Sequence, residues 1–373
     1  MEKKQVHKLN KIVMTGGHAA STAFVVIQEI RKQKKPWEIY WIGFKSSFEG
    51  ENISTLPSVY FPKYGIKTYD LISGRVQTKV SLHTLSAFLK IPVGFVHAAL
   101  LLAKVRPNLI LSFGGFSAFP VVVVGYFLGI PVIIHEQTSV VGRANKFSAP
   151  FAKKIAISRE TSRKYFPKEK RVLTGNPVGR DIVKNKLVEP DPHEPVILIT
   201  GGQSGSTSIN TAMEGAINDL LKTAKIRHLT GFKQEEKFKR IRDMLEPQLK
   251  ERYEVYGMVD PKKYNEIFNS CAMVISRAGA NVVSNIVVSG KPSVLIPLPI
   301  SYLDEQYKNA LFAKKAVGAR ILMQEDLTSQ SLVREVDYVV KNLETYSGKR
   351  SLKDNPDINA SERIVALIEG NMK

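Results

Sequence analysis

The chain has 373 residues, enough for two domains of ordinary size, each with its own hydrophobic core. Hydrophobic residues make up 43% and charged residues 24%, which is typical of globular proteins and excludes a disordered chain. The formal net charge is +20, which attracts nucleic acid, anionic membranes or phosphorylated ligands. Because the lysines are spread along the chain without a nucleic-acid reader motif, we expect a membrane surface and a phosphorylated ligand, and no nucleic acid.

Cys271 is the only cysteine, which excludes an intramolecular disulfide and a metal site built of several cysteines. It lies in an apolar run that predicts a strand, so we expect a small buried residue. The first residues, Met-Glu-Lys-Lys, lack the apolar stretch of a signal peptide. This start predicts a protein that stays in the cytoplasm.

Short runs rich in Val and Ile alternate with helical patterns, which predicts parallel sheets covered by helices on both faces. We expect strands at 12–14, 38–43, 109–113, 132–135, 154–158 and 171–174, then at 196–200, 226–229, 254–258, 273–276, 293–297 and 320–323. Three prolines within 187–195 predict a linker. We therefore expect a first domain at 1–186 and a second at 196–354. A last helical segment within 355–373 could pack back on the first domain or stay with the second.

The segment 82–103 is strongly apolar, but Lys90 and Pro92 interrupt it. A charge at the centre of a membrane span costs roughly 3 kcal/mol, so we reject a transmembrane helix. One interpretation is a buried helix pair broken at Pro92. The other is an interfacial membrane patch, since apolar side chains beside cations hold anionic leaflets. Its members would be Leu82, Leu85, Phe88, Leu89 and Ile91, with Arg75, Lys79 and Lys90.

Two apolar strands each run into a Gly-Gly turn, at Gly16-Gly17-His18 and at Gly201–Gly205. Such a turn directs backbone N–H groups and a helix N-terminus at an anion, usually a phosphate. Because both halves begin this way, we expect two similar α/β domains facing one ligand.

Further turns follow predicted strands, and ligands of open α/β sheets bind outside the carboxyl ends of the strands. Each turn alone could be an ordinary connection. Their coincidence at one edge of the sheets favours a ligand site. These turns lie at 112–120, 135–138, 175–180, 276–285 and 304–309.

In order, the motifs are Gly-Gly-His, Ser-Gly-Arg, Phe-Gly-Gly-Phe, His-Glu-Gln, Gly-Asn-Pro-Val, Gly-Gly-Gln-Ser-Gly, Ser-Arg-Ala-Gly-Ala and Gln-Tyr-Lys-Asn-Ala. Over nearly the whole chain this series resembles the MurG family of cell-wall glycosyltransferases. The resemblance implies an α/β, GT-B fold of two Rossmann-like, doubly wound parallel-sheet domains facing a cleft. It implies inverting transfer of N-acetylglucosamine from UDP-GlcNAc to lipid I, an undecaprenyl-diphosphate-linked muramyl peptide. The product would be lipid II, made for peptidoglycan by a peripheral enzyme on the cytoplasmic side of the cell membrane.

The chemistry of the residues agrees with that family. A nucleotide-sugar donor releases a diphosphate whose negative charge must be neutralised. The chain has no Asp-x-Asp pair to hold a metal, so we expect neither metal nor cofactor. Helix N-termini, backbone N–H groups and Arg180 would neutralise the charge instead. His18 could act as the general base for the acceptor hydroxyl, or could cap a helix or bind a phosphate.

The resemblance assigns site residues by their positions in the motifs. It implies a donor site mostly in the second domain, with Thr138 and Arg180 contacting the donor from the first domain. The expected donor residues are Thr138, Arg180, Gln203, Ser204, Gly205, Val259, Ala278, Gly279, Ala280, Asn281, Ser284, Asn285 and Gln306. The acceptor diphosphate would lie against Gly16, Gly17, His18, Gly114, Gly115 and Phe116, with its lipid tail toward the patch at 82–103.

The chain departs from the family pattern at several positions. The first glycine loop is shortened, and an alignment without a gap would put Ser21 at the histidine position. Thr138 replaces the usual Asn, and Gly179 displaces Arg180 by one position. Asn285 replaces the acidic residue that holds the ribose, which removes charge assistance from that hydrogen bond. Two alternatives therefore stay open: a related GT-B enzyme with another lipid acceptor or nucleotide sugar, and a non-catalytic, membrane-attached binding protein.

Overall fold

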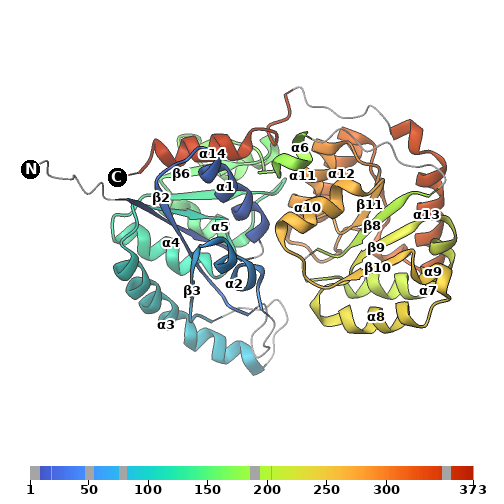
Figure 1. The fold of residues 1–373 in the computed structure, drawn as a ribbon. Coiled ribbons are helices and arrows are strands. Elements are labelled where there is room, and N and C mark those ends of the chain that lie inside the picture. The colour runs from blue at the N-terminus through green and yellow to red at the C-terminus, as the bar shows by residue number, and fades with distance from the viewer. Residues whose placement is uncertain are drawn as a thin grey trace, which may run out of the picture. The chain divides into compact units, whose positions relative to one another are not determined.

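The computed structural model describes residues 9–17, 19–46, 54–74, 82–184, 194–202, 204–346 and 354–372, and of 82–90 only the backbone. The chain divides into two compact units (Figure 1). Unit 1 contains the described residues up to Gln137, then Val141–Gly175 and the chain from Asn359 onward. Unit 2 contains Thr138–Val140 and the described residues within Asn176–Ile358.

Unit 1 is built on a seven-stranded parallel sheet in the order β3-β2-β1-β4-β5-β6-β7. Val13 of the central strand pairs with Tyr40 on one side and Ile110 on the other, so β1 is buried on both edges. The strands are β1 (Asn10–Thr15), β2 (Trp37–Gly43), β3 (Lys67–Asp70), β4 (Leu109–Ser112), β5 (Val132–Glu136), β6 (Lys154–Ile157) and β7 (Arg171–Leu173).

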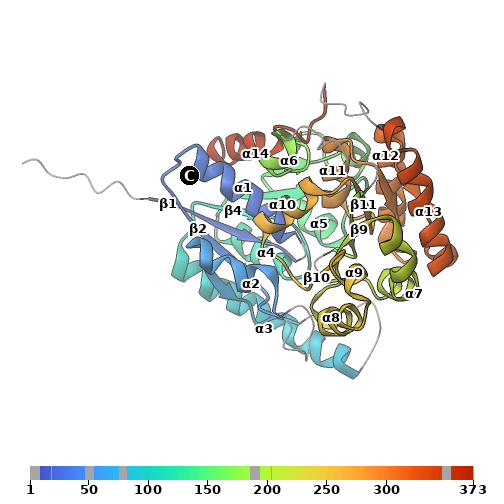
Figure 2. The ribbon, with the colours of Figure 1, turned by 45° about the vertical axis from the view of Figure 1, so that its right-hand side comes forward.

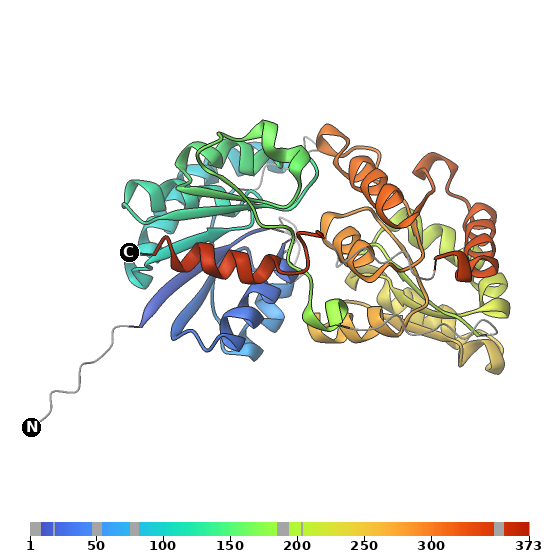
Figure 3. The same cartoon turned by 90° about the horizontal axis from the view of Figure 1, so that it is seen from above.

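Helices cover both faces of this sheet. On one face, Ala98 and Leu102 of α3 and Val121 of α4 pack into the core against Val13 and Ile110. Elsewhere in the unit α1 packs against α14, the red helix of Figure 3, so the last helix lies with the first unit. The helices are α1 (Ala20–Lys32), α2 (Leu56–Tyr60), α3 (Leu82–Val105), α4 (Ala118–Phe127), α5 (Arg143–Ser148) and α14 (Ala360–Glu369), with short 3-10 helices at Pro62–Tyr64, Ala149–Phe151 and Glu160–Tyr165.

Unit 2 repeats the arrangement with six parallel strands in the order β10-β9-β8-β11-β12-β13. The strands are β8 (Val196–Thr200), β9 (Lys225–Leu229), β10 (Tyr253–Tyr256), β11 (Met273–Ser276), β12 (Ser293–Leu295) and β13 (Arg320–Ile321). The helices are α6 (Arg180–Lys184), α7 (Thr207–Thr223), α8 (Glu235–Asp243), α9 (Pro247–Lys250), α10 (Pro261–Ser270), α11 (Ala280–Ser289), α12 (Glu305–Val317) and α13 (Ser329–Lys341), with 3-10 helices at Phe232–Gln234, Tyr302–Asp304, Gln324–Asp326 and Leu343–Tyr346.

Side chains of β8 alternate between the two helical layers of unit 2, as the period of a strand requires. Ile197 and Ile199 enter the core formed with α7 and α13, whereas Leu198 enters the core formed with α10, α11 and α12. Figure 2 shows α7 and α13 on one side of the strands and α10 on the other. The near-continuous apolar strands follow from this burial on both faces.

The strands expected at 196–200 and 273–276 are confirmed to the residue, and ten others are confirmed with ends shifted by one or two residues. The strand β3 is not predicted, because Lys67–Asp70 has charged ends and lies at the edge of its sheet. The expected helix break at Pro92 is wrong: α3 runs continuously from Leu82 to Val105 with Pro92 inside it. A proline inside a helix removes one backbone hydrogen bond, and α3 packs against α4.

The chain passes into unit 2 at Asn176, ahead of the expected boundary at 186. The Asn176 N–H donates to Asp357 Oδ1 at 2.7 Å, and the Gly179 backbone lies close to the Asn265 side chain. These contacts fix 176–179 on unit 2. Residues 185–193, which contain most of the expected linker, lie outside the described residues.

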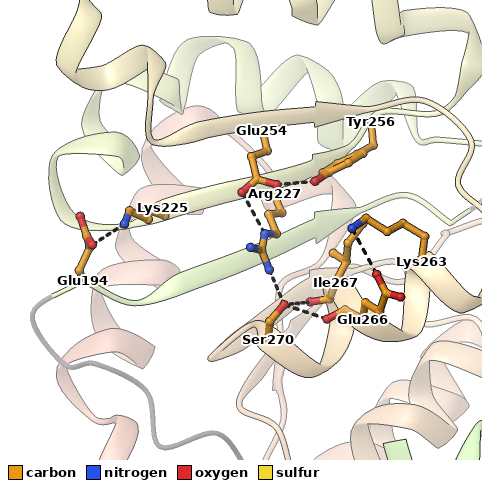
Figure 4. A network of polar contacts seen from close by, with 9 residues as sticks. All are labelled: Glu194, Lys225, Arg227, Glu254, Tyr256, Lys263, Glu266, Ile267 and Ser270. Atoms are coloured by element: carbon orange, nitrogen blue, oxygen red, sulfur yellow. Dashed lines mark hydrogen bonds and ion pairs between the residues drawn. The ribbon is translucent and has the colours of Figure 1, made fainter. Parts of the chain in front are cut away.

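A polar network links β9, β10 and α10 in unit 2 (Figure 4). Arg227 Nε pairs with Glu254 Oε1 at 3.2 Å and its guanidinium also donates to Ser270, while Tyr256 donates to Glu254. Lys225 pairs separately with Glu194 at 2.6 Å. These groups are partly exposed, so each pair contributes about 0–1 kcal/mol to the stability of the fold.

Candidate active site

In unit 1, the loops after β1 and β4 cross each other at the carboxyl edge of the sheet. The Gly17 N–H donates to the Gly114 carbonyl at 2.9 Å, and Ser117 Oγ donates to the Gly16 carbonyl at 3.1 Å. The loop after β5 joins them, since Gln137 Nε2 donates to the Phe113 carbonyl at 3.2 Å. The structure therefore brings together three of the first-half motifs that the sequence analysis singled out: Gly-Gly-His, Phe-Gly-Gly-Phe and His-Glu-Gln.

Gly115 is required where the two loops cross. Its φ is +90°, and a Cβ there would lie 2.8 Å from the Gly17 nitrogen. A side chain would be strained by both the backbone angle and the contact. The next residue, Phe116, has half of its surface exposed. The crossing thus presents glycine backbone and one aromatic ring at the edge of the sheet.

The His-Glu pair of the third motif supports this edge. His135 is fully buried, and its Nε2 lies 3.1 Å from the Gly175 carbonyl. Glu136 is also buried and accepts from the Gly142 N–H and from Asn145 Nδ2, both at 2.9 Å. These side chains fix the loops after β5 and β7, so neither is placed to take a proton from a ligand.

Two predicted site residues, His18 and Gln203, lie outside the described residues, as do Arg75 and Lys79 of the expected membrane patch. For Leu82, Leu85, Phe88, Leu89 and Lys90 only the backbone of α3 is described. Ile91 is half-buried. Further along α3, three apolar side chains are between 48% and 63% exposed: Val93, Val96 and Leu100.

In unit 2, the loop after β8 forms a tight glycine turn. The Gly202 N–H donates to Thr200 Oγ1 at 3.0 Å, and Ser206 caps α7 by accepting from the Ile209 N–H. Gly205 has a φ of +75°, and a Cβ there would lie 2.1 Å from the Thr230 carbonyl oxygen. Ser204, an expected donor residue, is exposed in this turn.

Asn176 organises the start of α11. Its Nδ2 donates to Asn281 Oδ1 and Ser284 Oγ, both at 3.0 Å. Ser284 is fully buried, so the structure shows it holding the helix in place. Gly279, the N-cap of α11, offers no capping side chain, and a Cβ there would meet nothing within 4 Å. The N–H groups of the first turn, which includes Ala280, therefore have no capping side chain at the N-cap and are suited to an anion.

The segment around Thr138 belongs with unit 2, although we expected it to act from the first domain. The Ser139 N–H donates to Asn309 Oδ1 at 3.2 Å, and Asn309 Nδ2 donates to the Ala278 carbonyl at 3.2 Å. Thr138 is 9% exposed. One asparagine of α12 thus joins the loop after β5 to the loop after β11.

Other expected donor residues also lie in unit 2. Arg180 begins α6 and is half-buried, which again places it with unit 2 instead of the first domain. Val259 is half-buried just before α10. Gln306 Oε1 accepts from the Leu298 N–H at 3.0 Å, which fixes the amide at the start of α12.

Asn285 makes a side-chain hydrogen bond with the Tyr264 hydroxyl. Burial raises the pKa of Tyr264 to about 12, so its hydroxyl stays protonated at neutral pH. The pair is therefore neutral. A ribose hydroxyl at this position would meet an amide dipole instead of a carboxylate charge.

Arg277 is the principal residue that the sequence analysis missed. Its Nε donates to Ser206 Oγ at 3.0 Å, its Nη1 to the Ile296 carbonyl at 3.2 Å and its Nη2 to Gln324 Oε1 at 2.6 Å. One guanidinium thus joins the glycine turn after β8 to the end of β12. Burial lowers the pKa of Arg277. The sequence feature that could have revealed Arg277 is its position: it is a cation that directly follows a buried strand, in the motif Ser-Arg-Ala-Gly-Ala.

Among the described residues, no three His, Cys, Asp or Glu side chains lie close enough to hold a metal ion together. None of the helices in that part of the chain combines the length and the apolar character that a membrane span requires.

Comparison with known proteins matches both units. The glycosyltransferase family 28 N-terminal domain matches residues 15–157, and the family 28 C-terminal domain matches residues 196–364. A UDP-N-acetylglucosamine--N-acetylmuramyl-(pentapeptide) pyrophosphoryl-undecaprenol N-acetylglucosamine transferase of Clostridium kluyveri is 32% identical over 97% of this chain and 99% of its own length. The chain belongs to the MurG family. A Clostridium tetani transferase of the same name is 31% identical over 96% of this chain and 97% of its own.

Solved structures show the same fold. Acinetobacter baumannii MurG superposes with a TM-score of 0.63 at 21% identity, covering 97% of this chain and 99% of that one. A Neisseria meningitidis UDP-GlcNAc 2-epimerase reaches a TM-score of 0.66 at 16% identity, covering 97% and 100%. Transferases and epimerases thus share the GT-B fold, which is confirmed for this chain. The assignment to a family of transferases depends on the sequence relatives.

Proposed function

We propose that this protein is the inverting, metal-independent glycosyltransferase that moves N-acetylglucosamine from UDP-GlcNAc to lipid I and forms lipid II for peptidoglycan. The observation that carries the proposal is the full-length match to transferases of that name, which includes both units. The two glycine turns at the carboxyl edges of both sheets support it, because donor and acceptor each carry a diphosphate.

Unit 2 would bind the donor. The uncapped N-terminus of α11 and the glycine turn before α7 would both offer backbone N–H groups to a diphosphate. Arg277 holds the turn in place through its hydrogen bond to Ser206, and Arg180 adds a positive charge in the same unit. Fixed dipoles and cations of this kind can stabilise the leaving UDP without a metal. Gln306 would contact the sugar hydroxyls.

Unit 1 would bind the acceptor. Its diphosphate would lie against Gly16, Gly17, Gly114, Gly115 and Phe116, where two loops present glycine backbone. His18 follows this turn in the sequence and would take the proton of the acceptor hydroxyl. His135 and Glu136 are occupied by structural hydrogen bonds, which favours His18 as the base.

The acceptor's lipid requires a membrane surface, and unit 1 supports a peripheral position on the cytoplasmic side of the cell membrane. Val93, Val96 and Leu100 recur every three or four residues along α3 and form one exposed apolar stripe. Tyr126 and Phe127 at the end of α4 are 52% and 74% exposed. The net charge of +20 favours an anionic leaflet.

The test supplies UDP-GlcNAc and a lipid I analogue in the presence of a metal chelator and measures UDP release and product mass. We expect turnover with the chelator present and a loss of roughly a hundredfold or more for His18→Ala. Absence of product with any polyprenyl-diphosphate acceptor would contradict the proposal. If calorimetry shows tighter binding of another sugar nucleotide, the protein would be a related GT-B enzyme with a different donor. If the parent and His18→Ala both bind vesicles but neither shows turnover, the protein would be a non-catalytic binding protein.

A further inference from the structure

Unit 2 has exposed apolar side chains on α12 and the loop before it. Figure 1 labels α12 within this unit. Tyr307 and Leu311 are each 41% exposed, and Ile300 is 88% exposed. Leu298 and Leu303 are 39% and 38% exposed. We call these five side chains the α12 surface. Large apolar side chains gathered in this way on a folded protein indicate an interaction site.

The helix places cations around this surface. Tyr307, Leu311 and Lys314 follow at intervals of four and three residues, so they share one face of α12. Lys308 and Lys315 are seven residues apart and flank the same face. The acidic residues nearby are Glu305, three residues from Lys308, and Asp304 at the end of the loop. The opposite face is buried in the core of unit 2: Asn309, Ala310, Ala313 and Val317.

The preceding loop is fixed in a conformation that exposes its apolar residues. Leu303 and Asp304 have φ values of +56° and +53°, an uncommon conformation for residues with side chains. Lys308 Nζ donates to the Leu303 carbonyl at 2.6 Å, and the Leu298 N–H donates to Gln306 Oε1 at 3.0 Å. Backbone strain that hydrogen bonds maintain, next to exposed apolar side chains, favours a functional role for the loop.

We infer that the α12 surface contacts an anionic lipid bilayer. Lys308, Lys314 and Lys315 outnumber Asp304 and Glu305 here, so the apolar centre has a net positive surround that matches the charge of such a leaflet. Apolar side chains with flanking cations are the pattern of interfacial helices. A protein partner fits less well, because lysine is depleted from protein–protein interfaces. The inference goes beyond the proposed function, in which only unit 1 contacts the membrane.

The first experiment places an environment-sensitive fluorophore at the surface through Leu311→Cys in the full chain. The native Cys271 is fully buried and burial raises its pKa to about 11, so a maleimide should label the introduced thiol selectively. Met244→Cys, at a residue 78% exposed after α8, is the matched control. With phosphatidylglycerol vesicles we expect a blue shift and about a twofold rise in emission at position 311 only, and neither with phosphatidylcholine vesicles.

The second experiment measures sedimentation with the same anionic vesicles. Since each lysine near an anionic surface is worth about a fivefold change in affinity, Lys314→Glu with Lys315→Glu should weaken partitioning by roughly twenty-fivefold or more. Leu311→Asp should also weaken it, and Met244→Asp should do so much less. Calorimetry of UDP binding verifies that each variant is folded. This control does not depend on catalytic turnover.

Two results would overturn the inference. One is a label at position 311 that stays in water while the sedimented protein is bound to vesicles. The other is a spectral change that follows protein concentration without vesicles, because it would show that the surface joins two copies of the chain. Neither readout requires catalysis, so a failure of the proposed reaction would be distinguished from a failure of this contact.

Discussion

The two sheets follow the same strand order from β3 to β6 and from β10 to β13, yet they use their first glycine turn differently. In unit 1 the turn after β1 is held by a second glycine loop, and Gly115 touches the backbone of Gly17. In unit 2 the turn after β8 packs on the loop after β9: a Cβ on Gly205 would meet the Thr230 carbonyl, and a Cβ on Gly231 would meet the backbone of Ser204 and Gly205. Both units therefore hold this turn with a second loop, which follows β4 in unit 1 and β9 in unit 2, and unit 2 adds the Arg277 guanidinium.

The amino edges differ as well. Gly-x-Pro precedes β5 in unit 1 and β12 in unit 2, with Ile130 and Lys291 between the two fixed residues. Ile130 packs on the apolar core. Lys291 is 3% exposed, and its Nζ donates to the Asn269 carbonyl at 3.1 Å and to the Cys271 carbonyl. The same turn thus accepts an apolar residue in one unit and a buried cation in the other.

The largest expected effect comes from placing an alanine in each of the two glycine turns in separate variants. Gly205→Ala should lower the free energy of unfolding of unit 2 by about 3 kcal/mol, because a Cβ would strain the backbone and meet the Thr230 oxygen. UDP affinity should fall by about a hundredfold or more as the turn is displaced. Gly115→Ala should instead keep UDP affinity and lose acceptor turnover. Denaturant unfolding, UDP calorimetry and turnover measure the three quantities.

Equal loss of UDP affinity in the Gly115 and Gly205 variants would contradict the assignment of one ligand to each unit. Ser204→Ala is the control within the unit 2 turn, since its side chain is exposed and its backbone can remain as it is. It should leave the free energy of unfolding within about 0.5 kcal/mol of the parent.

The second prediction concerns the buried cation. Burial lowers the pKa of Lys291 to about 8, whereas an unfolded lysine titrates near pH 10.4. Between these values the unfolded chain binds more protons, so the free energy of unfolding should rise with pH, by about 2–3 kcal/mol over the whole interval. Lys291→Ile, which installs the residue found at this turn in unit 1, should remove that rise. Urea unfolding between pH 7.5 and 10.5 measures it, and an unchanged slope in the variant would contradict it.

The third prediction tests how unit 2 holds its turn with a single guanidinium. Arg277→Lys keeps the charge but cannot donate to Ser206, Ile296 and Gln324 at once. We expect UDP affinity to fall by about 10- to 30-fold, since a buried hydrogen-bond network loses roughly 1–2 kcal/mol. Arg320→Lys, whose guanidinium pairs with Glu335 at the sheet edge, is the control and should change UDP affinity less than about twofold. Equal affinity in both variants would show that the Arg277 contacts are dispensable.

Much of this arrangement could be predicted because apolar strands that end in glycine turns fix where loops begin. Strands 196–200 and 273–276 have that form, whereas the edge strand Lys67–Asp70 has no apolar run to reveal it. The loops of the site were predictable for the same reason. Asn176 and Arg277 were not, because their importance depends on which distant loops meet at their side chains. The sequence motifs show that these polar residues are present, but they do not show which residues their side chains contact in the fold.

The smallest expected effect concerns the neutral pair of Asn285 and Tyr264 in unit 2, where the sequence analysis expected an acid from the resemblance. Asn285→Asp would place a carboxylate beside the Tyr264 hydroxyl, and hydrogen bonds to a charged group are roughly twice as strong as neutral ones. If a ribose hydroxyl binds here, UDP affinity should rise about threefold while affinity for 2′-deoxy-UDP stays the same. Calorimetry with both nucleotides measures the difference, and Asn285→Ala should lower only the UDP value. Parallel changes for both nucleotides would mean that the ribose lies elsewhere. The contrast between the two units would then lie in their glycine turns and in the buried lysine, and not in how unit 2 holds the sugar of the nucleotide.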